Sequence, residues 1–286
     1  MLNEHFLSKN WLGASKSFDK SDWTLVGLPY DGTCSYRPGS RFAPEQIRLA
    51  SWGLETYSPY QNKDLDEIAF YDAGELDLPL GNRDASLNII FVAVQKILAE
   101  NKHWLGIGGE HLVTYPVIQA YFKKYPDLAV IHFDAHADLR DDYLGEKLSH
   151  ATVMRRICDL LGAENLTQIG IRSGTKDEFE WMQVNNTQIM NKSEIPQILS
   201  KLANRPIFLS VDLDVLDPGV LSGTGTPEPG GMSFNELISW LLEFKSLNFV
   251  GADVVELSPN YDTSGVSTIV AAKIIREILL LAAHHI

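Results

Sequence analysis

Two short stretches of the sequence place ionisable side chains at alternate positions directly after apolar runs. The stretch "VIHFDAHAD" (130–138) carries Asp134, His136 and Asp138, and "SVDLDVLD" (210–217) carries Asp212 and Asp214. Alternate side chains of an extended chain point to one side, so each group converges if the strand geometry persists that far. One aspartate is typical of a cap or turn and one histidine of a core residue, but five such groups leaving two buried strands would repel one another. A bound cation between the stretches is therefore expected.

The charge balance of these residues indicates two ions. Two divalent ions supply four positive charges, and the four aspartates supply four negative charges. A further ligand, His111, follows another apolar run and a glycine turn in "GIGGEH" (106–111). The set then holds two histidines, four aspartates and no thiolate. Such oxygen-rich ligation suits Mn²⁺ better than a structural Zn²⁺, with Ni²⁺ and Co²⁺ as open alternatives.

These apolar runs belong to a pattern of short β-rich segments that alternate with amphipathic stretches. Strands are expected at 23–29, 68–74, 104–109, 128–136, 166–172, 187–190, 206–217 and 249–257, and helices at 84–100, 114–124, 150–162, 175–183, 193–203, 233–245 and 265–284. The alternation is typical of a mostly parallel, doubly wound α/β sheet, which binds ligands outside the carboxyl ends of its strands. No repeat or linker divides the chain, so a single domain over 1–286 is expected. The last helix is apolar on more than one face, which indicates deep packing or a subunit contact.

Composition narrows the classes of partner. The formal charge of −13 over 286 residues argues against nucleic acid, which needs clustered Lys and Arg, and mildly favours a cationic ligand. The first 20 residues lack a signal-peptide pattern, and no apolar stretch reaches the length of a membrane span. A soluble, cytoplasmic protein with no membrane partner is expected. Cys34 and Cys158 are too few for a disulfide framework, which predicts a reducing compartment.

Six motifs in order carry a resemblance to a known family. They are "GGEH" (108–111), "DAHAD" (134–138), "SHATVMRR" (149–156), "SVDLDVLDP" (210–218), "GTGTPEPGG" (223–231) and "ADVVELSPNYD" (252–262). In this order and spacing they resemble the ureohydrolase superfamily, the arginase and agmatinase group. The third and fifth motifs, "SHATVMRR" and "GTGTPEPGG", are closer to the agmatinase branch. The likeness also includes "GLPYDGTCSYRPGSRFAPEQIR" (27–48) and so covers most of the chain. It implies a three-layer, arginase/deacetylase-like fold with about eight strands.

The resemblance also implies a role for each candidate site residue. Two Mn²⁺ ions per subunit, bridged by a hydroxide, are expected, one held by His111, Asp134, Asp138 and Asp212 and the other by Asp134, His136, Asp212 and Asp214. Guanidinium is a poor electrophile, so catalysis needs an anion that orients it and an acid that reaches the leaving nitrogen. Glu256 is expected to bind the guanidinium and His150 to transfer the proton, and Asp138 completes the expected catalytic set. His132 matches no ligand position, and we expect it either to contact a ligand residue from the side away from the metal or to fill space in the core.

The reaction implied by the resemblance is that of an agmatinase, the hydrolysis of agmatine to putrescine and urea in polyamine synthesis. Alternatives within the class are a guanidinobutyrase, an arginase and a formimidoylglutamase. An alternative of another class is a non-catalytic relative that binds a metal or a small ligand. The family habit and the apolar last helix suggest a homo-oligomer, either a trimer or a hexamer.

The choice of agmatine depends on the loop "LRDDYLGEKLS" (139–149). Its Asp141, Asp142 and Glu146 would favour the ammonium tail of a small cationic guanidino substrate. Charged loops are equally often plain solvated surface. Arg140 in the same loop would favour a carboxylate-ended substrate such as 4-guanidinobutanoate.

Overall fold

An eight-stranded sheet forms the centre of the structure, a computed structural model that describes residues 10–15 and 17–283. Its strands are β1 Trp23–Leu28, β4 Phe70–Glu75, β5 His103–Gly108, β6 Ala129–Phe133, β7 Leu166–Ile169, β8 Gln188–Ile189, β9 Pro206–Asp212 and β10 Asn248–Val255. They lie in the order β4-β1-β5-β10-β9-β6-β7-β8, and every neighbouring pair is parallel. A separate antiparallel pair consists of β2 Tyr57–Ser58 and β3 Lys63–Asp64. The carboxyl ends of the eight strands therefore lie along one edge of the sheet.

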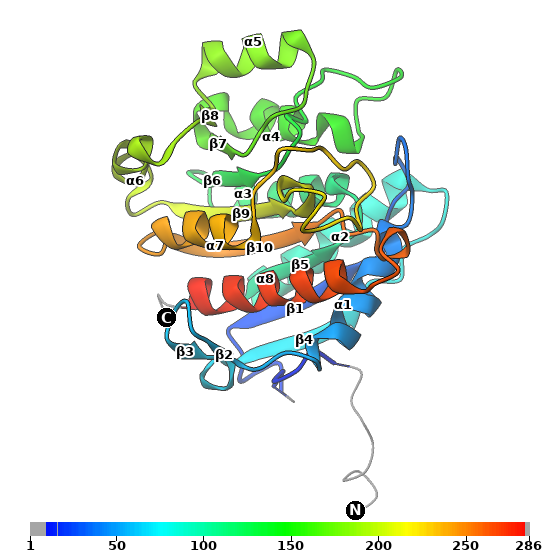
Figure 1. The fold of residues 1–286 in the computed structure, drawn as a ribbon, viewed down its shortest axis with the longest axis vertical. Coiled ribbons are helices and arrows are strands. Elements are labelled where there is room, and N and C mark those ends of the chain that lie inside the picture. Colours follow the sequence, from blue (N-terminus) through cyan, green and yellow to red (C-terminus); the bar gives the residue numbers. More distant parts are fainter. Residues whose placement is uncertain (1–9, 16, 284–286) are drawn as a thin grey trace, which may run out of the picture.

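Helices cover both faces of this sheet and complete a three-layer fold (Figure 1). One face carries α1 Ala43–Ser51, α6 Ile195–Leu202, α7 Phe234–Glu243 and α8 Val266–Ala282, and the other carries α2 Arg83–Ala99, α3 Thr114–Lys124, α4 Val153–Leu161 and α5 Lys176–Asn185. In Figure 1 the helices α1, α7 and α8 lie in front of the strands. The expected class, a parallel doubly wound sheet of about eight strands flanked by helices, is confirmed.

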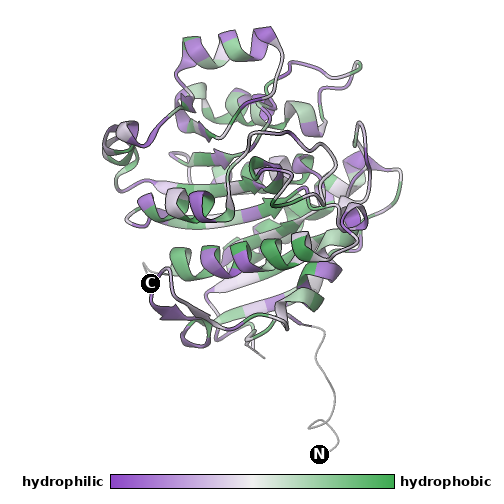
Figure 2. Cartoon of the chain, in the orientation of Figure 1, coloured by the Kyte–Doolittle hydropathy of each residue, from purple (hydrophilic) through white to green (hydrophobic). Residues whose placement is uncertain are grey.

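Neighbouring residues of each central strand pack into different halves of the core. Val130 belongs to the cluster beneath α2 and α3, whereas Ile131 belongs to the cluster beneath α7 and α8. Because both faces of the sheet are covered, its strands are nearly continuous apolar runs and do not alternate with polar residues. In Figure 2 hydrophobic residues occupy parts of the central strands and much of helix α8, which packs against them. This close-packed core fixes the positions of the strand ends.

Most residues of α8 are buried, and they include an ion pair between Arg276 and Glu277. Deep packing within the chain therefore accounts for the apolar character of this helix on several faces. In the described part of the chain, no helix is long and apolar enough to cross a membrane. The expected end of this helix at residue 284 lies outside the described residues. The same is true of residues 1–9, which belong to the segment without a signal-peptide pattern.

The expected strands and helices are all present, but the two acidic strands end earlier than expected. Strand β6 ends at Phe133, and β9 ends at Asp212. The Asp212 carboxylate accepts a hydrogen bond from Asp214 N at 2.9 Å and caps a 3₁₀ turn that replaces the extended chain. Helix α1 is absent from the expected set because its apolar pattern is weak: Ile47 is buried, but Leu49 is exposed. Alternation along a strand therefore does not explain how the acidic side chains converge.

Candidate metal centre and catalytic pocket

The candidate site residues follow four neighbouring strands in the middle of the sheet, β5, β10, β9 and β6. His111 begins a 3₁₀ turn after β5, Glu256 follows β10, Asp212 ends β9, and Asp134 follows β6. Because these strands are parallel and adjacent, their carboxyl ends meet at one edge. The topology of the sheet thereby joins side chains that are far apart in the sequence.

One imidazole nitrogen faces three carboxylates. His111 Nδ1 lies 3.2 Å from Asp134 Oδ2, 3.3 Å from Asp138 Oδ2 and 3.3 Å from Asp212 Oδ2. This nitrogen is buried and makes no hydrogen bond among the described residues. Neighbouring ligands of one ion with bond lengths of about 2.1 Å lie roughly 3 Å apart. The four atoms therefore have the spacing of a shared coordination shell, with the residues expected for the first ion.

Hydrogen bonds behind His111 leave this nitrogen available to a cation. His111 Nε2 lies 3.0 Å from Ser210 Oγ, which donates to Asp253 Oδ1 at 2.7 Å, and Thr114 Oγ1 donates to Asp253 Oδ2 at 2.8 Å. Since the Ser210 hydroxyl gives its proton to Asp253, its oxygen accepts from His111. Nε2 of the neutral ring then carries the proton, and Nδ1 presents a lone pair to the carboxylates. Histidine ligands of metals are commonly held in this way.

A second imidazole lies on the other side of Asp134. His136 Nδ1 lies 2.9 Å from Asp214 Oδ2 and 3.6 Å from Asp134 Oδ1, and ligating atoms of these three side chains lie within 4.8 Å of one another. Asp134 therefore directs one oxygen toward His111 and the other toward His136. Asp214 Oδ1 also accepts from Ala135 N at 3.1 Å, which ties the end of β9 to the end of β6. The six expected ligands thus form two adjoining groups.

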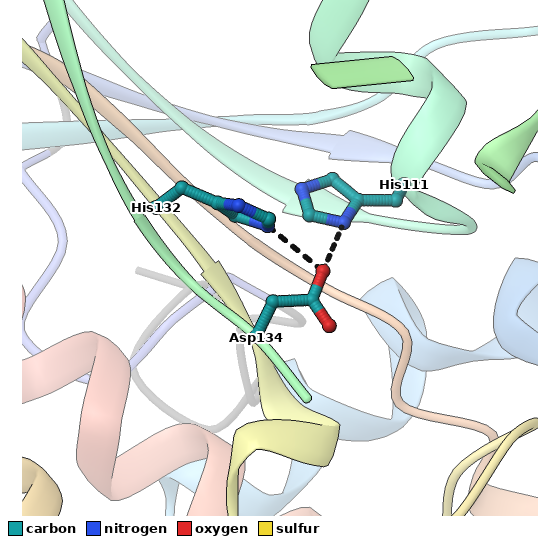
Figure 3. Close-up of side chains that lie close together, drawn as sticks. All are labelled: His111, His132 and Asp134. Atoms are coloured by element: carbon teal, nitrogen blue, oxygen red, sulfur yellow. Dashed lines mark hydrogen bonds and ion pairs between the residues drawn. The ribbon is translucent and has the colours of Figure 1, made fainter. Parts of the chain in front are cut away.

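His132 supports Asp134 from within the sheet (Figure 3). Its Nε2 lies 2.8 Å from Asp134 Oδ2, and Gln168 Nε2 lies 3.2 Å from its Nδ1. The amide of Gln168 also donates to Ala137 O at 2.9 Å, so His132 Nδ1 accepts from this amide and Nε2 donates to Asp134. Burial lowers the pKa of His132, which keeps the ring neutral. His132 therefore orients a carboxylate that also faces His111.

The charges of this cluster call for a cation. Burial and the charge of Asp134 raise the pKa of Asp138 to about 7, and burial with the charges of Asp214 and Asp134 holds the pKa of Asp212 well above its usual range. Burial disfavours a charged His136, but the two carboxylates beside it outweigh burial and raise its pKa to about 12. Among the described residues, no Lys or Arg pairs with these aspartates. Divalent ions would neutralise the carboxylates at neutral pH, so the donor set fits them.

Glu256 lies beside the first ligand group. Its Oε1 accepts a hydrogen bond from His111 N at 2.7 Å. Its backbone is left-handed, with φ +66°, and Asp138 shares this conformation with φ +53°. Such a conformation costs a residue other than glycine about 1–3 kcal/mol and is concentrated at functional sites. Burial and the charge of Glu110 hold the pKa of Glu256 well above its usual range, so a cation that entered here would stabilise its ionised form.

A pocket at this edge of the sheet joins the ligand groups to His150. Its lining includes His136, Asp138, Asp212, Asp214, Glu256 and His150. His150 begins the 3₁₀ turn before α4, where its Nε2 lies 3.1 Å from Ser35 Oγ and its ring packs edge-on against Tyr143. Burial lowers the pKa of His150 to about 4. The ring is therefore neutral at neutral pH and presents a nitrogen to the pocket.

The structure does not bring the acidic side chains of the loop 139–149 into the lining of this pocket. Asp141 Oδ1 accepts from Arg156 Nη2 at 2.9 Å, and Glu146 Oε2 accepts from Arg83 Nη1 at 2.5 Å. Asp142 caps a turn of its own loop, and all three carboxylates are exposed. Their charges are therefore compensated or solvated outside the pocket.

Two other residues of this loop do line the pocket, Arg140 and Tyr143. Arg140 Nε lies 3.7 Å from Glu178 Oε2, and its guanidinium lies 5.0 Å from the centre of the Tyr143 ring. Glu178 is buried and also lines the pocket, where Leu139 N donates to its Oε1 at 2.9 Å. The Arg140 guanidinium therefore already has an acidic partner, Glu178, and an aromatic partner, Tyr143.

Several residues of the site are absent from the expected set. Asp253 has a signal in the sequence, because it is a charged residue inside the buried run of β10, and it lies in register with Ser210 of β9. Thr33 and Ser35 have no such signal. They come from a loop more than a hundred positions before His150, and only the folded chain brings them to it.

The chain belongs to the arginase family. The family model described as "Arginase family" matches residues 21–281 and so includes every candidate site residue. The resemblance inferred from the six motifs is confirmed. The cluster of His and Asp side chains at the strand ends is therefore the metal-binding cluster of an arginase-family protein.

Relatives with full-length similarity share a functional name. An agmatinase from Bacillus cereus is 47% identical over 98% of both chains, and an agmatinase from Bacillus subtilis is 48% identical over 98% of both chains. The crystal structure of a Clostridium difficile protein has a TM-score of 0.90 and 44% identity, and the match covers 93% of this chain and 99% of that one. The similarity therefore extends over the whole fold and is not confined to the site.

Proposed function

We propose that this protein is an agmatinase that hydrolyses agmatine to putrescine and urea with two Mn²⁺ ions. One observation carries the proposal: Asp134 has Oδ2 3.2 Å from His111 Nδ1 and Oδ1 3.6 Å from His136 Nδ1. A carboxylate placed between two imidazole ligands supports a two-metal hydrolase. The similarity to bacterial agmatinases supports the choice of agmatine.

The ligands of the two ions are those expected from the motifs. One ion would be held by His111, Asp134, Asp138 and Asp212, and the other by Asp134, His136, Asp212 and Asp214. Four aspartates balance two divalent ions, and this oxygen-rich set favours Mn²⁺, with Ni²⁺ and Co²⁺ as alternatives. When bound, the ions would lower the pKa of a water molecule toward neutrality and so supply the nucleophile for hydrolysis.

Glu256 and His150 supply the remaining chemistry. The Glu256 carboxylate accepts two N–H groups of the planar guanidinium and orients its central carbon toward the ligand groups. His150 is neutral at pH 7, so its Nε2 can take up a proton and pass it to the leaving nitrogen, since the amine departs only when protonated. Asp138 acts in catalysis through its place in the first ligand group.

The surroundings of the pocket favour an ammonium tail over a carboxylate tail. A carboxylate such as that of 4-guanidinobutanoate would have to compete with Glu178 for Arg140. The sequence predicts direct binding of the tail by Asp141, Asp142 and Glu146, but these residues lie outside the pocket lining, so the proposed site does not include them.

Urea release by the Mn²⁺-loaded protein tests the proposal. Agmatine, arginine and 4-guanidinobutanoate are compared at equal concentrations, with metal analysis of the same sample. We expect agmatine to be the best substrate and about two Mn²⁺ per chain. Agmatine ranking last would reject the proposed substrate, and binding of guanidino compounds without urea release would favour a non-catalytic relative. Reconstitution with Ni²⁺ or Co²⁺ in parallel identifies the preferred ion.

A cytoplasmic location and a homo-oligomer, trimer or hexamer, complete the proposal. Light scattering coupled to size exclusion gives the mass in solution directly. A mass of three or six chains is expected from the resemblance to the family, and a mass of one chain would reject it.

A further inference from the structure

Thr33 lies between a buried carboxylate and His150. Thr33 N donates to Glu110 Oε2 at 2.7 Å, and Thr33 Oγ1 lies 2.5 Å from Glu110 Oε1. On its other side, Thr33 Oγ1 accepts from His150 N at 3.0 Å and lies 3.4 Å from His150 Nδ1. The three residues form a continuous hydrogen-bonded chain from the core to the wall of the pocket.

Glu110 is an unusual residue to find in this position. Its side chain is fully buried, and in the described part of the chain no Lys or Arg forms an ion pair with it. It belongs to none of the expected ligand or catalytic residues, although it precedes the ligand His111. A buried carboxylate without a cationic partner is costly unless hydrogen bonds compensate it. Both oxygens of Glu110 receive a hydrogen bond from Thr33, which offsets part of this cost, while burial still raises the pKa of Glu110 to about 7.

The hydrogen bonds of Thr33 determine which ring nitrogen of His150 carries the proton. A threonine hydroxyl has a single proton to donate. When Glu110 is ionised, Thr33 gives this proton to its carboxylate, so the Thr33 oxygen accepts from His150. His150 Nδ1 then carries the ring proton, and the lone pair of Nε2 faces the pocket, where Ser35 Oγ lies 3.1 Å away. This is the tautomer that can take up a proton at Nε2 and release it to a leaving nitrogen.

We propose that Thr33, held by Glu110, is a positioning residue that sets the tautomer and the ring orientation of His150 for proton transfer. The proposal rests on the proposed function, which gives His150 its proton-transfer role. A carboxylate that orients a histidine is an established device of hydrolases. In this protein the Thr33 hydroxyl stands between the carboxylate and the ring and relays the effect.

Two substitutions at Thr33 separate the hydroxyl from the shape of the side chain. Thr33→Val removes the hydroxyl at nearly constant volume, and Thr33→Ser keeps it. In the Mn²⁺-loaded full-length protein we expect Thr33→Val to lower kcat for agmatine about 10- to 100-fold, as for loss of a residue that orients a site histidine. The KM and the Mn²⁺ content should stay unchanged, and Thr33→Ser should retain most of the activity. Thr24→Val is the matched control, because the buried Thr24 hydroxyl has no hydrogen-bond partner among the described residues.

A double variant tests whether Thr33 acts through His150. If it does, adding Thr33→Val to His150→Asn produces no further loss of kcat. Losses that multiply, an unaffected Thr33→Val, or a Thr33→Val that loses Mn²⁺ would each overturn the inference. A fully active His150→Asn would instead reject the proton-transfer role in the proposed function. If Thr33→Val fails to fold, Thr33→Ala enters the same comparison with Thr33→Ser.

Discussion

The floor of the pocket and the loop at its rim are both acidic, yet their charges have different partners. On the floor, the ligand aspartates at the ends of β6 and β9 are buried, and their carboxylates contact histidines. At the rim, Asp141 and Glu146 are exposed, and each contacts an arginine. A carboxylate attracts a ligand where the protein neither neutralises it nor leaves it in water. The partners of an acidic residue, more than its place beside a pocket, therefore decide what it can bind.

The two regions also differ in what holds them. The floor consists of residues at the ends of four adjacent parallel strands, which the core fixes from both sides. The rim is an irregular loop whose residues 144–147 are all exposed. Precise spacing of several ligands needs the first kind of support. Substitutions on the floor should therefore have much larger effects than equal changes of charge at the rim.

The largest effect is expected for Asp134→Asn, which removes the charge shared by the two ligand groups. Breaking one partner of a buried charge cluster costs about 3–5 kcal/mol, so Mn²⁺ affinity should fall by roughly two to four powers of ten. Urea release should fall with it. Atomic absorption of the dialysed variant, beside an agmatine assay, measures both quantities. Asp141→Asn, the same change at the rim, is the matched control, and a variant that keeps two Mn²⁺ would contradict the bridging role.

A smaller but more selective effect is expected for Glu256→Gln. The amide cannot accept a charge-assisted pair of hydrogen bonds from guanidinium, so kcat/KM for agmatine should fall roughly 100- to 1,000-fold, as for loss of one preorganised electrostatic group. The Mn²⁺ content should stay at the wild-type level, because Glu256 is not among the proposed ligands. Loss of metal in this variant would show that Glu256 supports His111 through its backbone hydrogen bond and not the substrate.

The floor was largely predictable from the sequence, and the reason is the parallel sheet. Once the apolar runs before His111, Asp134 and Asp212 are recognised as strands, their ends must meet if the strands are neighbours. The alternation of Asp134, His136 and Asp138 correctly predicts that these side chains lie together, but an extended strand is not what brings them together. The strand ends at Phe133, and the left-handed backbone of Asp138 turns its side chain toward His111.

The rim and the residues behind the ligands were not predictable in the same way. An acidic loop does not reveal that Arg83 and Arg156, from α2 and α4, will contact its carboxylates. The link from Glu110 through Thr33 to His150 depends on a loop that no periodic pattern describes. Such contacts form between irregular segments, where spacing along the sequence carries little information about distance.

A third effect, on metal affinity, follows from the protons that the floor holds. With a pKa raised to about 7, Asp138 is largely protonated below pH 7, and with a pKa of about 12, His136 is protonated throughout the neutral range. Metal binding displaces these protons, so Mn²⁺ affinity should rise with pH, about tenfold per pH unit for each proton displaced. The rise should be steeper below pH 7, where Asp138 also contributes. Calorimetric titration of metal-free protein with Mn²⁺ from pH 6 to 8 measures the slope, and a flat profile would contradict the assignment.

The smallest effect is expected at the rim itself. The exposed carboxylate of Asp141 accepts a hydrogen bond from Arg156, and this bond is the main cause of the lowered pKa of Asp141. The negative charge of Asp141 is therefore already paired with an arginine. Exposed ion pairs of this kind contribute little, and Asp141→Asn should change kcat/KM for agmatine by less than about threefold. Asp142→Asn and Glu146→Gln should behave alike, because neither side chain lines the pocket. Butylguanidine, a guanidine with an uncharged tail, is the comparison substrate. If the KM rises for agmatine but not for butylguanidine, the rim binds the ammonium group, and the floor alone does not select the substrate.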